Sequence, residues 1–68
     1  MKTREEVLKD LQLAASICND NITINYDMRY QTKNDDLVRY YENEIAEHQI
    51  ILNAINDAIY IIEHKVVK

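Results

Sequence analysis

The C-terminal half of the chain carries an apolar repeat that runs without interruption for four heptads. Its nine positions recur at alternating spacings of three and four residues: Val38, Tyr41, Ile45, His48, Leu52, Ile55, Ile59, Ile62 and Val66. This spacing places all nine on one side of an α-helix, as in the seam of a coiled coil or a helical bundle. From Ile51 onward the stripe is three positions wide, which favours a bundle over a two-stranded coil. We therefore predict an all-α fold with a long helix over about residues 36–66.

A second, shorter helix is predicted near the N-terminus. Thr3 and Glu6 match a capping box, in which each side chain accepts a hydrogen bond from the backbone N–H of the other residue. An apolar stripe then repeats at spacings of three and four residues: Leu8, Leu11, Ala15, Cys18 and Ile22. The run Asn19-Asp20-Asn21 competes with a helix for backbone hydrogen bonds, so we predict that this helix covers about residues 4–19.

The segment between the two helices, about residues 20–34, has a different pattern. Apolar residues alternate there with polar ones, at Ile22, Ile24, Tyr26, Met28 and Tyr30, which is the period of a β-strand. A lone strand leaves its backbone groups unpaired unless the same segment of a second chain pairs with it. The segment can therefore be an extended loop, a poor helix or a short intermolecular strand at 22–30; we predict an extended, tyrosine-rich connector. Asn34 then supplies an N-cap for the long helix, with Asp35 and Asp36 in its first turn.

Together these features predict one small helical domain, residues 1–68, folded as an antiparallel hairpin with a short first and a long second helix. At 1.5 Å per residue the first helix would be about 24 Å long and the second about 46 Å, so half of the second would lack a partner. That half also carries apolar residues on its outer side, at Ile50, Ala54, Tyr60 and Ile61. We therefore predict a homodimer or higher even oligomer, a helical bundle whose interface consists of His48, Leu52, Ile55, Ile59, Ile62 and Val66.

The composition excludes several kinds of site. The chain has no glycine, and the loops that cradle nucleotide phosphates need glycine for positive φ angles and close approach to the ligand. Its one cysteine cannot form an internal disulfide or a CxxC pair for zinc or redox chemistry, which fits a reducing compartment. No apolar run approaches the roughly 20 residues that span a bilayer, and the first residues lack the apolar core of a signal peptide. We expect a cytoplasmic protein with no membrane partner.

Candidate chemistry is limited to a few side chains. His48 lies in the seam with Glu44 four residues before it, so the pair could present two metal ligands on one helix face. Di-iron bundles use Glu-x-x-His instead, and a single polar seam residue more often selects register or oligomeric state. Ser16 and Cys18 are the only serine and cysteine, and Cys18 on the apolar stripe is expected to be a buried, unreactive thiol. We predict no catalytic residue, no metal site and no cofactor.

Four of the five tyrosines lie between residues 26 and 41, interleaved with basic residues. In a dimeric β-ribbon such a segment could read the major groove of DNA. Against nucleic-acid binding stand the net charge of −4, the acidic residues within the segment and the lack of a basic cluster. We predict instead that the segment recognises a partner protein through Tyr26, Arg29, Tyr30, Lys33, Arg39 and Tyr40.

The expected function is protein–protein interaction rather than catalysis. The first hypothesis is a small acidic regulator or inhibitor of a partner protein, from a low-GC bacterium or its phage, because the chain is rich in Ile, Asn and Tyr. One alternative is a dimeric nucleic-acid-binding protein that uses residues 22–41, whose affinity would fall steeply with salt. Another is a purely structural assembly protein.

Overall fold

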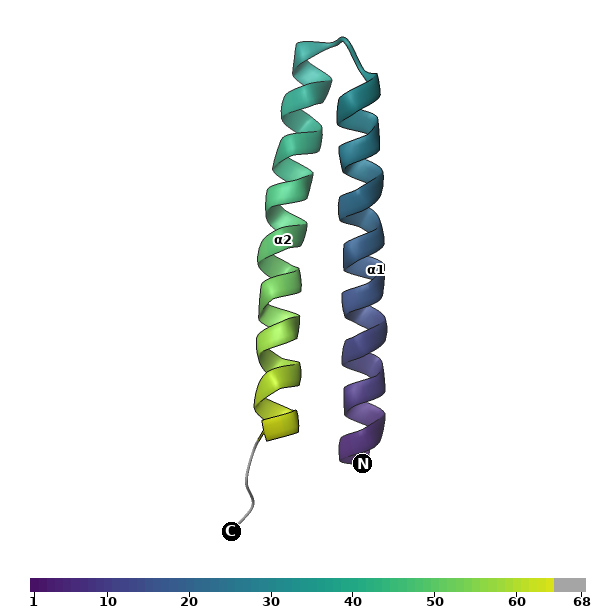
Figure 1. The fold of residues 1–68 in the computed structure, drawn as a ribbon, viewed down its shortest axis with the longest axis vertical. Helices are drawn as coiled ribbons and strands as arrows, with labels where there is room; N and C mark the ends of the chain where they lie inside the picture. Colours follow the sequence, from purple (N-terminus) through teal and green to yellow (C-terminus); the bar gives the residue numbers. More distant parts are fainter. Residues whose placement is uncertain (65–68) are drawn as a thin grey trace.

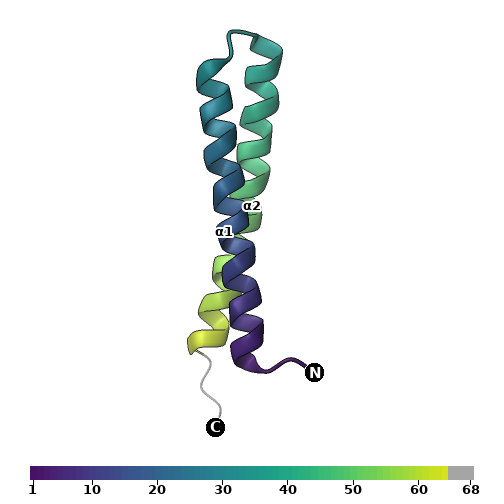
Figure 2. The ribbon, with the colours of Figure 1, turned by 90° about the vertical axis from the view of Figure 1, so that its right-hand side faces the viewer.

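Residues 1–64 are described by the computed structural model, in which two antiparallel α-helices are joined by a short turn (Figure 1). Helix α1 spans Arg4–Gln31 and helix α2 spans Asp35–His64. They contain 28 and 30 residues and are therefore about 42 and 45 Å long. The two helices cross each other along their length (Figure 2), and the molecule measures 55 × 16 × 16 Å. The prediction of an all-α antiparallel hairpin is confirmed.

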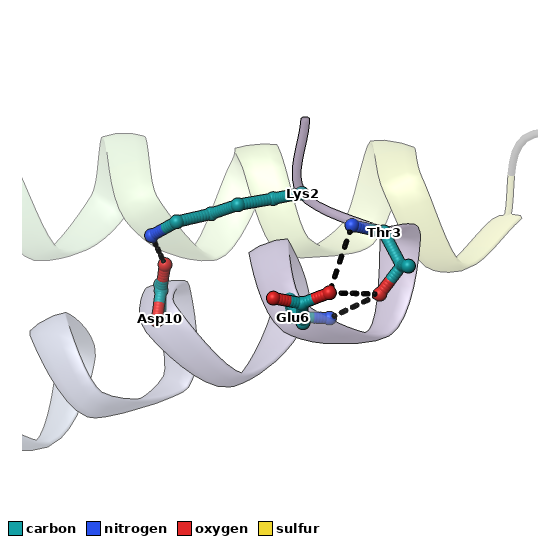
Figure 3. A network of polar contacts seen from close by, with 4 residues as sticks. All are labelled: Lys2, Thr3, Glu6 and Asp10. Carbon is teal, nitrogen blue, oxygen red and sulfur yellow. Dashed lines mark hydrogen bonds and ion pairs between the residues drawn. The ribbon is translucent and has the colours of Figure 1, made fainter.

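The start of α1 is fixed by the predicted capping box. The Thr3 hydroxyl accepts from the Glu6 N–H at 3.2 Å, and the Glu6 carboxylate accepts from the Thr3 N–H at 3.3 Å (Figure 3). Lys2 lies over the first turns and pairs with Asp10 (Figure 3). The first N–H groups of a helix have no partner within it, and a cap of this kind typically contributes about 1 kcal/mol. The sequence signal and the structure agree at this position.

The predicted end of the first helix is wrong, because α1 continues for twelve residues beyond residue 19, to Gln31. Its polar side chains bond to the helix backbone instead of ending the helix: Thr23 Oγ1 donates to the Asn19 carbonyl at 3.1 Å, and Asn25 Nδ2 donates to the Asn21 carbonyl at 2.7 Å. Each Asn or Asp costs at most about 0.7 kcal/mol relative to alanine inside a helix. Ending the helix here would cost more, since backbone groups would lose their partners and Ile22, now 6% exposed, would leave the core.

Neither an extended connector nor an intermolecular strand forms at residues 22–30, since this whole segment lies within α1. A period of two on a helix spreads apolar side chains around the helix instead of gathering them on one face. Only Ile22 of the alternating set is buried, while Ile24, Tyr26, Met28 and Tyr30 are exposed. The alternation is therefore a sign of a helix that is apolar on more than one side.

The turn between the helices consists of residues 32–34. Thr32 ends α1 with an extended backbone and donates its N–H to the Met28 carbonyl at 3.1 Å. The Asn34 side chain accepts from the N–H groups of Asp36 at 2.9 Å and Leu37 at 3.2 Å. Asn34 therefore caps α2 as predicted, and the acidic first turn is present. The start of α2 lies within one residue of the predicted position; the predicted end near residue 66 lies outside the described residues.

The core of the hairpin is a single layer between the two helices. Among residues 1–64, the buried apolar side chains are Cys18 and Ile22, at 5% and 6% exposure. Around them, half-buried side chains from both helices complete the seam: Val7, Leu8, Leu11, Ala14 and Ala15 of α1, with Val38, Tyr41, Ile45, His48, Leu52, Ile55, Ala58, Ile59 and Ile62 of α2. The predicted seam stripes of both helices are therefore correct in the described residues.

The C-terminal half of α2 has a partner within the same chain. The Arg4 guanidinium donates to the Ile62 carbonyl at 2.7 Å and to the Glu63 carbonyl at 3.2 Å, so the start of α1 lies beside the end of α2. The expectation that this half of α2 is left uncovered is wrong, because it depended on a first helix half as long as the real one. A second chain would therefore have to contact another surface of the hairpin.

Candidate interaction surfaces

The first candidate surface is a shallow groove along one side of the hairpin. Its volume is about 320 Å³ and it is lined by Tyr26 and Arg29 of α1 and by Glu42, Ile45, Ala46 and Gln49 of α2. The Arg29 guanidinium lies 3.8 Å from the Glu42 carboxylate, and both side chains are about half exposed. An ion pair of this kind contributes at most about 1 kcal/mol, so its groups remain available to a binding partner.

The groove identifies which flanks of the two helices lie on the same side. Each residue advances about 100° around a helix, so Tyr26 lies on one flank of the α1 seam, and Ile17 and Ile24 lie on the opposite flank. In α2, Glu42 and Gln49 line the same groove as Tyr26, while Ile51 lies on the other flank. The far side of the hairpin therefore combines the flank of α1 that carries Ile17 with the flank of α2 that carries Ile51.

This far side is the second candidate surface, and we call it the apolar face. Exposed large apolar side chains lie on this side or at its outer edges in both helices: Ile17, Ile24 and Met28 of α1 with Tyr40, Ile51 and Ile61 of α2 on it, and Leu13 and Ile50 at the edges. Leu13 is 62% exposed and Ile50 69%, in contrast with the two buried seam residues. Large apolar side chains that two helices expose on one side of a small chain mark a candidate interaction site.

The total exposed area supports the same conclusion. The chain exposes 5703 Å², whereas a compact monomer of 8.1 kDa exposes about 4,500 Å². The excess is about 1,200 Å². Each partner in a standard protein–protein interface loses about 800 Å², so the hairpin has enough surplus surface for one such interface.

The six side chains predicted to bind a partner are distributed over several sides of the hairpin. Tyr26 and Arg29 meet in the groove, and Tyr30 is 93% exposed on the same flank of α1. Tyr40 lies at the edge of the apolar face, with its ring edge-on to Tyr41 at 5.3 Å between centroids. Of the other two, Lys33 is in the turn, and Arg39 is exposed on the groove flank of α2, seven residues before Ala46.

The residues predicted to form an oligomer interface lie in the seam between α1 and α2. His48, Leu52, Ile55, Ile59 and Ile62 are half-buried there, and Val66 lies outside the described residues. The sequence did not predict the apolar face as a surface shared by both helices, although it identified Ile50 and Ile61 as apolar residues on the outer side of α2. The missing signal was in α1, where Leu13, Ile17, Ile24 and Met28 recur at spacings of four, seven and four residues.

His48 makes its side-chain hydrogen bond within its own helix. Its Nδ1 lies 2.7 Å from the Glu44 carbonyl oxygen and 3.7 Å from the Glu44 carboxylate. The contact across the seam comes from the Cys18 thiol, which donates to the His48 carbonyl at 3.0 Å. Within residues 1–64, no three His, Cys, Asp or Glu side chains come together in a group that could hold a metal ion.

The chain was compared with protein-family models, with curated proteins and with solved structures, and none of them matches it. Over the described part of the chain, neither helix combines the length and the apolar character needed to cross a membrane.

Proposed function

We propose that this chain is a non-enzymatic protein–protein interaction module, a small acidic regulator that acts in the cytoplasm as a dimeric helical bundle and binds a partner protein. The observation that carries the proposal is the apolar face, which leaves large aliphatic side chains of both helices in water. Leaving such side chains exposed forgoes about 1.5–3 kcal/mol for each one that a partner would bury. A surface of this kind favours association over catalysis.

The nucleophiles of the chain support a non-catalytic function. Cys18 is buried and its thiol donates to a backbone carbonyl, which suits a packing residue rather than a reactive one. Ser16 is exposed on α1. Neither Ser16 nor Cys18 lines the groove. A free thiol is also in keeping with a reducing compartment.

The groove is the better surface for the regulated partner. It is lined by an aromatic side chain, Tyr26, and a cationic one, Arg29. Tyrosine and arginine are residue types that often dominate the binding energy of protein interfaces. Tyr30 extends the same flank toward the turn and is almost fully exposed. A partner seated here would contact three of the six residues that the sequence predicted for recognition.

The alternative of nucleic-acid binding has less support. A phosphate-binding surface needs basic side chains on one side of the molecule. Here Arg29 already pairs with Glu42, and the acidic Glu42 lines the groove on the same flank of α2 that carries Arg39. With a net charge of −4, the chain repels a polyanion at a distance.

The test is capture of partners from a lysate of the source cell with the tagged full-length chain, followed by titration with the purified, identified partner. We expect the double variant Tyr26→Ala, Arg29→Ala to bind at least about 10-fold more weakly, because each side chain typically contributes a kcal/mol or more in an interface. The matched control is Tyr60→Ala, another exposed tyrosine at the far end of the same side. Equal affinities for the wild type and the double variant would contradict a groove-bound partner. Recovery of nucleic acid that dissociates at higher salt would favour the alternative.

A further inference from the structure

We infer that the apolar face is covered by a second copy of this chain, in a two-fold dimer centred on Ile17 and Ile51, and that the groove stays free on the outside of that dimer. The inference specifies the partner and the contact surface of the dimer in the proposed function, and in that sense rests on it. It replaces the interface expected from the sequence, because the seam residues of that interface contact α1 of their own chain.

The position of the face along the hairpin favours a second copy. A two-fold dimer requires a patch that meets itself, since the same surface is used by both subunits. The middle of α1 falls between residues 17 and 18, and the middle of α2 between residues 49 and 50. Ile17, Ile50 and Ile51 therefore lie at the centre of the hairpin. Two hairpins laid face to face bring these isoleucines together whether their turns point the same way or opposite ways.

Polar residues occur both at the end of this side and near its centre. Asp10 and Glu6 are toward the start of α1, beyond Leu13, whereas Glu47 lies one turn before Ile51 and Asp20 one turn after Ile17, all four at exposed positions. The dimer contact would therefore be formed by the isoleucines and bordered closely by carboxylates, which are depleted in the core of standard interfaces. Glu6 is also engaged in the capping box and Asp10 with Lys2, so neither carboxylate is left without a partner when the face is covered.

The exposed area is sufficient for a dimer. The surplus of about 1,200 Å² per chain exceeds the roughly 800 Å² that each subunit loses in a standard interface. Covering the apolar face also turns the one-layer core into a four-helix core, since α1 and α2 then each contact two other helices. The groove is on the opposite side, so a face-to-face dimer leaves both of its grooves in water.

The first test is the mass in solution of the wild type and of single glutamate variants, by light scattering or sedimentation at tens of micromolar. We expect the wild type at twice 8.1 kDa. The substitutions Ile17→Glu and Ile51→Glu should each weaken the dimer at least about 100-fold, because every variant residue is present twice in the interface. The matched control is Tyr60→Glu, which adds the same charge at another exposed site, on the groove side, and it should leave the dimer intact.

The second test covers the case in which a glutamate variant fails to fold. A single thiol is placed on the face by Ile17→Cys with Cys18→Ala, and on the groove side by Tyr60→Cys with Cys18→Ala. A maleimide should react with the thiol at position 17 at least about 10-fold more slowly at high than at low protein concentration. The thiol at position 60 should react at one rate throughout.

Three results would overturn the inference: a wild-type monomer at these concentrations, a dimer that survives Ile17→Glu with its helicity intact, or equal reactivity of the position-17 thiol at all concentrations. These results can be told apart from failure of the proposed function. A monomer that still binds a partner through the groove would support the regulatory function and exclude the dimer. A dimer that captures no partner would support the dimer and contradict the regulatory function.

Discussion

The two halves of α1 form one continuous helix from very different sequences. Residues 4–18 begin with a capping box and carry a regular seam stripe, with only Leu13 and Ile17 as large apolar side chains outside it. Residues 19–31 contain Asn, Asp and Thr and carry apolar side chains on three sides. The first half can be predicted as a helix from its capping box and its apolar spacing alone. The second half is helical because α2 is beside it, since Ile22 is buried between the two helices. Tertiary contact therefore overrides local preference over about three turns of helix.

The largest expected effect comes from a proline in the second half. Thr23→Pro removes a backbone donor and clashes with the preceding turn, so it should cost about 3 kcal/mol or more of unfolding free energy in a continuous helix. Urea denaturation followed by circular dichroism measures it. Lys33→Pro is the control, because it lies in the turn, where the preceding Thr32 already has the extended backbone that a proline requires. Equal costs at the two sites would mean that residues 20–31 are not helical.

The next largest effect is expected at the one buried aliphatic residue of the second half. Ile22→Ala should cost about 2–4 kcal/mol, the usual range for truncating a core side chain. The control is Ile24→Ala, which removes the same atoms two residues along the helix from an exposed site. Midpoints of urea unfolding, at a protein concentration low enough to populate the monomer, give both values. A larger loss at Ile24 than at Ile22 would contradict the packing of α1 against α2.

A smaller effect is expected at the cap of the first half. Thr3→Ala removes the hydroxyl that accepts from the Glu6 N–H and should cost about 1 kcal/mol. Thr3→Ser retains the acceptor and should stay within about 0.5 kcal/mol of the wild type. Thermal or urea unfolding of the three proteins provides the comparison. If alanine and serine behave alike, the capping box does not stabilise the first half.

The smallest effect has the opposite sign. Asn19→Ala replaces a poor helix former at an exposed position of α1 and should stabilise the protein by about 0.5 kcal/mol. Gln12→Ala, at an exposed position of the first half, should change stability by less, because glutamine is already a good helix former. A loss of stability for Asn19→Ala would indicate that the asparagine has a function in the fold beyond its propensity.

Much of the hairpin could be predicted from spacing and capping alone. The 3-4 repeat identified the seam of α2, and Thr3, Glu6 and Asn34 marked the starts of both helices, because these signals depend on residues close together in the chain. The continuation of α1 could not be predicted in this way. Its stabilisation comes from residues of α2 on the other side of the turn, as in the pairing of Arg29 with Glu42, 13 positions away, and a local pattern contains no information about them.

The apolar face shows a second limit of reading one helix at a time. On α1 alone, Ile17 and Ile24 look like scattered exposed residues, and on α2 alone Ile51 looks like a widening of the seam. They become one surface only when the antiparallel pairing and the handedness of both helices are known. The groove has the same origin, since it is defined by one flank of each helix. Surfaces that two elements build together require the pairing before they can be recognised.

The location of the groove and the apolar face on opposite sides of a hairpin only 16 Å thick has a consequence for valency. When two hairpins meet through their apolar faces, their grooves point away from each other, about the thickness of two hairpins apart. The dimer then carries two binding grooves on opposite sides of a rigid helical bundle. A partner that is itself dimeric, or that is present in several copies on a larger complex, would be bound by both grooves at once. Its dissociation would then be far slower than the affinity of a single groove implies.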